Sequence, residues 1–197
     1  MTDAPTAPAP RFRRPTTEDA VEVARELLDE GERVDMQAVA RRLGVSRATV
    51  HRWFGTRDAL MAALFEHLAA EFREEAEAGA RGTGDDRAFD FVRRIAERAA
   101  SYAPLSIAAA REPGVVLRLV MAEDGPVHAE VADTLHRLLA ATRTPTEMAR
   151  IADAIDLFST TAITLHWATI AAGGTPDAGR YERLGRALLA DAERPRR

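Results

Sequence analysis

The strongest constraint on the fold is a break of only three residues, Gly44-Val45-Ser46, between two short segments whose apolar residues have helical spacing. Asp35 is suited to cap the first segment, which ends at Gly44, and Ser46 is suited to cap the second, which ends at Gly55. A connection of this length is typical of a helix-turn-helix. We therefore expect helices over residues 36–43 and 47–54 that cross closely.

Cap and stop signals divide the rest of the chain into further helices, and no segment reads as a strand. The best start signal is Thr144-Pro145-Thr146-Glu147, a full capping box with proline at the first helical position. Further helices are expected at about residues 17–30, 57–78, 89–99, 113–122, 126–142, 145–172 and 176–192, with a shorter helical piece at 105–111. The expected fold class is all-α with about nine helices.

Composition narrows the protein class. The 197 residues are 46 % hydrophobic, which is ample for a buried core, and they include no cysteine, which excludes disulfide frameworks and thiol chemistry. The first fourteen residues lack the apolar segment of a signal peptide, and polar residues and glycines interrupt the longest uncharged run, residues 157–176. We expect a cytoplasmic protein without a membrane partner, in which residues 1–15 are a disordered arm, 16–60 a first domain and 61–197 a second.

The net charge of −4 hides a local concentration of positive charge. Between Asp35 and Asp58 the chain has no acidic residue, but it has five arginines: Arg41, Arg42, Arg47, Arg52 and Arg57. A solvated helix face normally mixes both signs of charge, so an uncompensated basic window indicates an anionic partner.

The expected second helix of the motif has the chemistry of a major-groove reader on its exposed face, which carries Arg47, Ala48, Thr49, His51 and Arg52. Arginine forms a bidentate pair with guanine, and an alanine or threonine methyl group can touch the methyl group of thymine. Phosphate contacts fix register without reading sequence, and we expect them from Ser46, Arg57 and either Arg41 or Arg42. Double-stranded DNA is the expected partner.

The run Val45 to Leu60 resembles the DNA-binding end of TetR-type bacterial transcriptional regulators, and the resemblance extends over about residues 16–68. It implies base contacts from Arg47, Ala48 and Thr49, a position near the phosphate backbone for Trp53, and a positive residue, Arg57, that opens the long fourth helix. This sequence departs from the family at His51, where a tyrosine usually contacts a phosphate. A histidine still donates a hydrogen bond, but its contact depends on pH.

The segments Arg111 to Val127 and Thr164 to Asp177 resemble the regulatory domain of regulators of the quorum-sensing-signal degradation type (QsdR-like), which implies a lactone or acyl-derived effector. The residues themselves favour a largely apolar pocket between the fourth to seventh helices and the helix capped by Thr144. The expected ligand-binding residues are Phe65, Tyr102, Met121, Phe158, Thr161, His166 and Trp167.

One helix-turn-helix makes too few contacts for specific affinity, so a homodimer is expected, with the last two helices of each chain forming a four-helix bundle. The expected interface residues are Met148, Ile151, Ile155, Phe158, Ala162, Leu165, Tyr181, Leu184 and Leu188.

Other chemistry has weak support. No two of His67, His128, His136 and His166 have the i, i+4 spacing that places two metal ligands on one helix face, and no phosphate-binding loop or nucleophile elbow is found. We expect no cofactor, metal or catalytic residue. The alternative to a ligand-controlled homodimeric repressor is an all-α enzyme or scaffold whose basic window binds a partner other than DNA.

Overall fold

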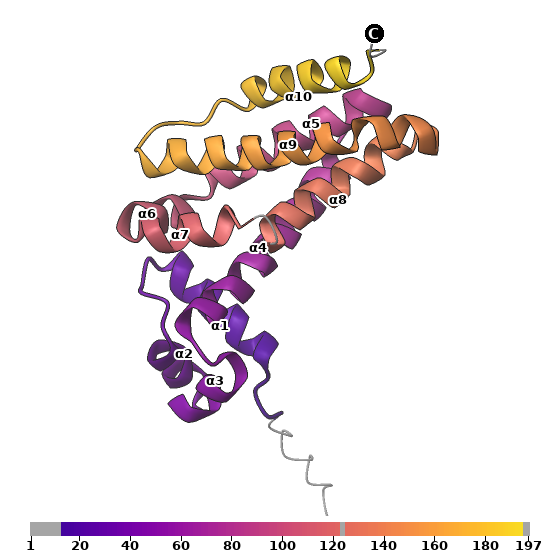
Figure 1. Ribbon diagram of the computed structural model, residues 1–197. Coiled ribbons are helices and arrows are strands. Elements are labelled where there is room, and N and C mark those ends of the chain that lie inside the picture. The colour runs from indigo at the N-terminus through magenta and orange to yellow at the C-terminus, as the bar shows by residue number, and fades with distance from the viewer. Residues whose placement is uncertain (1–12, 123–124, 195–197) are drawn as a thin grey trace, which may run out of the picture.

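The computed structural model describes residues 13–122 and 125–194, and over this part of the chain it contains ten α-helices and no strand (Figure 1). The expected all-α class is therefore confirmed. The helices are α1 (Thr17–Asp29), α2 (Met36–Leu43), α3 (Arg47–Phe54), α4 (Arg57–Gly79), α5 (Gly84–Ser101), α6 (Ala103–Arg111), α7 (Pro113–Val120), α8 (Pro126–Ala140), α9 (Pro145–Ala171) and α10 (Ala178–Ala192).

Side-chain caps start the four N-terminal helices where the sequence predicts them. Thr16 forms a capping box with Asp19, and the side chain of Asp35 accepts hydrogen bonds from the first turn of α2. Ser46 and Thr56 cap α3 and α4 in the same way. Gly44 ends α2 at φ +68°, in the left-handed region that glycine adopts without strain. The helix-turn-helix follows from these local signals.

Helices α1, α2 and α3 form a small bundle that is closed by the first turns of α4. Its centre consists of fully buried small and branched residues, including Ala20, Ala24, Val39, Val50 and Leu60. Small side chains at these positions let the helices approach closely, so the short α3 is held firmly although it is only two turns long.

Helix α4 belongs to both halves of the molecule. Figure 1 shows it running from the three-helix bundle into the larger group of helices, where α5 and α8 lie against it. Helices α6 and α7 lie between α1 and α9, and α9 and α10 lie at the far end from α2 and α3. Close packing fixes α10: a Cβ atom on Gly185 would lie 2.2 Å from Cε1 of Phe89.

The observed helix ends differ from the expected ones most at α5, which begins at Gly84 rather than at about residue 89, and then at the start of α10. We expected α10 to start at Thr175-Pro176, but it begins after Asp177, whose side chain accepts a hydrogen bond from the backbone N–H of Gly179. The expected arm at residues 1–15, apart from its last three residues, and Asp124 of the expected turn lie outside the described residues. In the described part of the chain, no helix has the length and apolar character needed to cross a membrane.

Candidate nucleic-acid interface and internal cavity

The N-terminal turn of α3 is an exposed surface held in place by the helix-turn-helix. Val50 is completely buried under α3, whereas Arg47, Ala48, His51 and Arg52 are exposed. Thr49 is half-buried, and its hydroxyl lies 2.9 Å from that of the capping residue Ser46. The side chains expected to face DNA therefore share one accessible face.

Three of the five arginines in the basic window keep their charge uncompensated. Among the described residues, no carboxylate forms an ion pair with Arg41, Arg47 or Arg52. Arg42 instead forms two hydrogen bonds of 2.8 Å to Glu30, the residue that caps the end of α1. The positive field is thus concentrated on α3 and the last turn of α2.

Arg57 has a different environment from the expected phosphate contact. Its Nε donates to the carbonyl oxygen of Val34 at 2.7 Å, and its two Nη atoms donate to Glu112 at 2.7 and 3.2 Å. Through these hydrogen bonds, the guanidinium links the start of α4 to the end of α6. The sequence could not reveal this because Glu112 lies 55 residues away.

Trp53, which we expected near the phosphate backbone, is half-buried and packs against the buried core. Trp53 therefore helps to anchor α3 on the core, while part of the residue stays exposed. Val45 and Phe54 pack in the same partly buried way, as the motif requires.

A cavity of about 80 Å³ lies inside the larger group of helices. Side chains from α4, α5, α6, α8, α9 and α10 surround it, and most are aliphatic or aromatic. The lining includes Phe65, Leu68, Phe72, Val92, Ile95, Leu105, Val127, Glu130, Val131, Phe158, Ala162, Ile163, His166, Trp167 and Tyr181. Such a wall binds an apolar molecule and offers few polar groups to orient it.

The cavity includes four of the seven expected ligand-binding residues: Phe65, Phe158, His166 and Trp167. Tyr102, Met121 and Thr161 are not in its wall. Met121 is 41 % exposed at the end of α7, and Thr161 is half-buried on another face of α9.

Helices α8 and α10 contribute lining residues that sequence reasoning missed, among them Val131 and Tyr181. Helix α7, which we expected beside the pocket, contributes none of the lining residues. The apolar stripes of α8 and α10 predicted buried faces but gave no sign of which faces meet around an open space.

His166 is the unusual member of the cavity wall. It is 5 % exposed, and neither ring nitrogen has a hydrogen-bond partner among the described residues. Burial lowers the pKa of the imidazole to about 4. The aromatic rings of Trp167 and Tyr181 lie 5.4 and 5.9 Å from it, centroid to centroid.

The structure corrects most of the expected dimer interface. Ile151, Ile155, Phe158, Ala162 and Tyr181 are buried within the single chain, in which α9 packs on α6, α7, α8 and α10, and α10 packs on α5 and α9. Met148, Leu165, Leu184 and Leu188 are half-buried and pack partly on the same core. Helix α9 is apolar on more than one face, and its strongest stripe faces inward.

The outward face of α9 has a different set of side chains. Leu157 is 56 % exposed, more than any other large apolar residue that the structure describes. Thr161, Thr164 and Ala168 continue from it along the helix at spacings of three and four, and they are half-buried or exposed.

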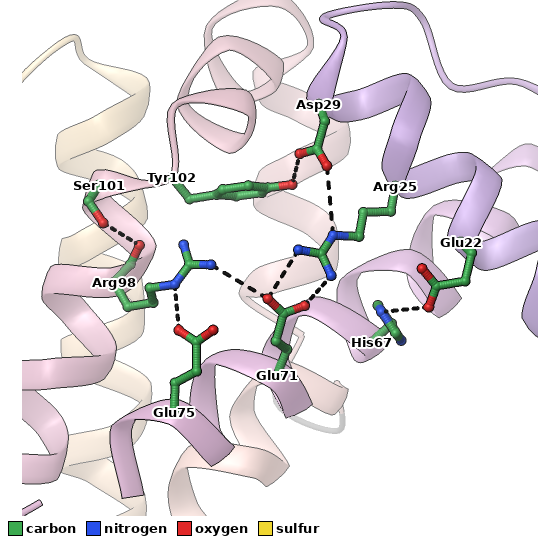
Figure 2. Close-up of polar contacts among 9 residues, drawn as sticks. All are labelled: Glu22, Arg25, Asp29, His67, Glu71, Glu75, Arg98, Ser101 and Tyr102. Carbon is green, nitrogen blue, oxygen red and sulfur yellow. Dashed lines mark hydrogen bonds and ion pairs between the residues drawn. The ribbon is translucent and has the colours of Figure 1, made fainter. Parts of the chain in front are cut away.

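A polar cluster joins the bundle of α1, α2 and α3 to the cavity wall (Figure 2). Arg25 of α1 forms hydrogen bonds with Glu71 of α4, and Arg98 of α5 approaches the same carboxylate at 3.5 Å. The Nε of Arg98 also donates to Glu75 at 2.7 Å. One carboxylate therefore ties three helices together.

Tyr102 completes this cluster rather than lining the cavity. Its hydroxyl donates to Asp29 of α1, and its ring meets Phe72, a cavity residue, edge to face at 5.4 Å. Burial and the hydrogen bond to Asp29 raise its pKa to about 12, so the hydroxyl remains protonated and keeps donating. A displacement of Phe72 would therefore shift Tyr102, which is hydrogen-bonded to α1.

That the protein has no metal site stays a prediction from the sequence. In the part of the chain that the structure describes, no three histidine or acidic side chains gather in the arrangement of a metal site. His128 and His136 instead lie near Thr160 and Asp156 of α9, at 3.1 and 3.3 Å.

We predict that Glu71→Gln lowers the free energy of unfolding by about 1–2 kcal/mol, because Arg25 and Arg98 lose the charged acceptor that they share. Glu74→Gln is the matched control, since Glu74 is exposed on the same helix and should change stability by no more than about 0.5 kcal/mol. Urea denaturation measures both values. Equal stability of the two variants would contradict a structural role for the cluster.

Stability should also depend on the protonation of His166. Because the unfolded chain binds a proton near pH 6.5 and the folded chain only near pH 4, stability is complete above pH 6.5 and falls as the pH drops toward 4. The expected loss is about 3 kcal/mol. His166→Leu should remove this part of the pH dependence, as measured by urea denaturation between pH 4 and 7. A variant with the unchanged pH dependence would refute this assignment.

Family models match both halves of the chain. The model for bacterial regulatory proteins of the tetR family matches residues 20–64, and the model for tetracyclin repressor-like C-terminal domains matches residues 83–190. A search of curated proteins found no match.

Two solved structures share the fold. One is the transcriptional repressor QsdR of R. erythropolis, from the TetR family, with 23 % identity, a TM-score of 0.75 and coverage of 88 % of this chain and 94 % of its own. The other is the TetR family repressor AlkX from Dietzia sp. strain DQ12-45-1b, implicated in biodegradation of n-alkanes, with 18 % identity, a TM-score of 0.61 and coverage of 94 % and 98 %. Since family models match both the helix-turn-helix and most of the remaining helices, the chain belongs to the tetR family of bacterial regulatory proteins.

Proposed function

We propose that the protein is a homodimeric transcriptional repressor that binds operator DNA through α3 and is controlled by a small, largely apolar effector. The observation that carries this proposal is the exposed, uncompensated arginine face on the helix-turn-helix. Membership of a family of DNA-binding regulators supports it, and both similar solved structures are described as repressors.

In the proposed complex, the N-terminal turn of α3 enters the major groove. Arg47, Ala48 and Thr49 lie in the first turn, where side chains reach base edges. Arg41 and Arg52 flank them with free charge and suit phosphates, as do the hydroxyl of Ser46 and the ring of His51. Arg42 and Arg57 are excluded from the proposed contact set, because Glu30 and Glu112 already bind their guanidinium groups.

The proposed dimer uses the outward face of α9, centred on Leu157, together with the partly exposed Leu184 and Leu188 of α10. These helices lie at the opposite end of the molecule from α3 (Figure 1). A two-fold axis there leaves both recognition helices free to reach successive major grooves, about 34–36 Å apart.

The proposed effector site is the cavity. Ligand pockets usually measure roughly 300–1,000 Å³, so an effector of ordinary size must push apart the walls of this cavity of about 80 Å³. Phe72 lies in that wall and against Tyr102, and Tyr102 is bonded to α1. Expansion of the cavity therefore acts on the cluster that holds the DNA-proximal bundle, and this is the proposed route of control.

The largely apolar wall supports a neutral, weakly polar effector, and a lactone or acyl compound is one such class.

We predict that Arg47→Ala weakens operator binding by roughly 1–3 kcal/mol and relaxes base preference at one operator position, since Arg47 is assigned to a base. Arg41→Ala should instead weaken all sequences alike and lower the salt slope by about one, since Arg41 is assigned to phosphate. Gel-shift titrations with the DNA upstream of the gene and with scrambled DNA give both quantities.

The control is Arg81→Ala, which removes the same charge from an exposed position between α4 and α5, outside both α3 and the proposed dimer face. If Arg47→Ala preserves the ratio of operator to scrambled affinity, the assignment of Arg47 to a base fails.

For the dimer, we expect Leu157→Glu to produce monomers that lose specific DNA binding, because it places a charge at the centre of the proposed interface. Ile107→Glu is the matched control, since Ile107 is a similarly exposed apolar residue on α6. Light scattering coupled to size exclusion measures the oligomeric state. A Leu157→Glu protein that remains dimeric would place the interface elsewhere.

A further inference from the structure

The cavity contains a polar group for which the folded chain supplies no partner. His166 lies in the wall, but neighbouring atoms cover its Nδ1 and Nε2 atoms, which form no hydrogen bond to any described residue, so a ligand reaches them only when the cavity widens. Buried polar groups are paired in the great majority of cases, because an unmade hydrogen bond costs stability. An exception inside a cavity is explained if a molecule bound there supplies the missing partner.

The imidazole is neutral at physiological pH, because burial lowers its pKa to about 4. A neutral imidazole offers one N–H donor and one nitrogen acceptor. It therefore matches a hydroxyl, which accepts and donates, or the carbonyl of an amide or ester, which accepts. It offers no positive charge to an anion.

The charged residue of the wall, Glu130, bears on which ligand charges the cavity accepts. Glu130 of α8 lies in the lining and pairs with Arg73 at 2.5 Å. Among the described lining residues there is no lysine or arginine. A carboxylate in the cavity would be desolvated without a cation beside it, so anionic ligands are disfavoured. A cationic ligand would have to compete with Arg73 for Glu130.

We propose that His166 is the hydrogen-bonding group that orients the effector, and that the effector is an uncharged molecule with an apolar body and a hydroxyl, amide or ester group at the His166 end. The inference rests on the proposed effector function of the cavity, and it adds which side chain selects the ligand and which charge state is accepted. The apolar body packs among Phe65, Phe72 and Phe158.

The test uses small probes that share one ring and differ in one group: toluene, benzyl alcohol, benzamide, benzoate and benzylamine. Their size demands the least enlargement of the cavity. Titration of the full-length protein at pH 7, followed by calorimetry or ligand-observed nuclear magnetic resonance, gives the affinity of each probe. Benzyl alcohol and benzamide should bind, whereas benzoate and benzylamine should bind at least about tenfold more weakly, because each brings an unpaired charge.

Two variants separate hydrogen bonding from cavity shape. His166→Leu removes the polar atoms while keeping an apolar side chain, and it should fold at least as stably as the parent because it deletes an unpaired buried group. It should weaken benzyl alcohol and benzamide about tenfold relative to toluene. His166→Gln retains a donor and an acceptor and should restore part of the loss.

Each outcome has a defined meaning. Equal losses for toluene and benzyl alcohol in His166→Leu, tight binding of benzoate or benzylamine, or failure of every probe to bind would overturn the role of His166. If the probes follow the predicted pattern but leave operator affinity unchanged in a gel shift, the role of His166 stands and the proposed control of DNA binding fails.

Discussion

The structure depends on one helix that belongs to two cores. The first turns of α4 close the three-helix bundle through Leu60, and its later turns place Leu68 and Phe72 in the cavity wall. Helix α4 has 23 residues and contributes side chains to both parts. The bundle that presents α3 and the wall of the cavity are therefore coupled through α4, and the contacts flanking α4 set how a movement is shared.

Those contacts are polar and lie at two points along α4. Near its start, Arg57 binds Val34 and Glu112, and further along, Glu71 binds Arg25 and Arg98. The Glu71 cluster is expected to contribute only about 1–2 kcal/mol to stability, and its ion pairs have a narrow geometry. A change of arrangement at this junction would therefore have a small energetic cost, as the proposed control by an effector requires.

Local signals in the sequence predict most of this fold. Caps such as Asp35, Ser46 and Thr144 act on backbone atoms within a few residues, so they mark helix ends without knowledge of the tertiary structure. The exposed face of α3 follows in the same way from the position of Val50. Ile155 and Tyr181 were predicted at a dimer interface, but they are buried within the chain. The reason is that periodicity marks a face as buried but does not identify the element that covers it.

Charge counting has the same limitation. Arg57 and Arg47 are equivalent in a sequence window, yet Glu112 neutralises the first from the end of α6 while the second stays free. The position of the cavity was also beyond the sequence, because an apolar stripe looks the same whether its partners fill the space or leave a gap. His166 was identifiable only as a candidate, since its significance is that no described residue forms a hydrogen bond with either ring nitrogen.

The size of the cavity bears on whether an effector would raise or lower the affinity for DNA. An effector changes DNA affinity only through its different affinities for the two arrangements of the molecule, and the DNA must change effector affinity by the same factor. The described arrangement has a cavity of about 80 Å³, which disfavours any larger molecule. On the proposed function, an effector that needs more room therefore stabilises a different arrangement. If the described arrangement is the one that binds DNA, effector and operator each lower the protein's affinity for the other. The protein is then released from DNA when the cavity fills.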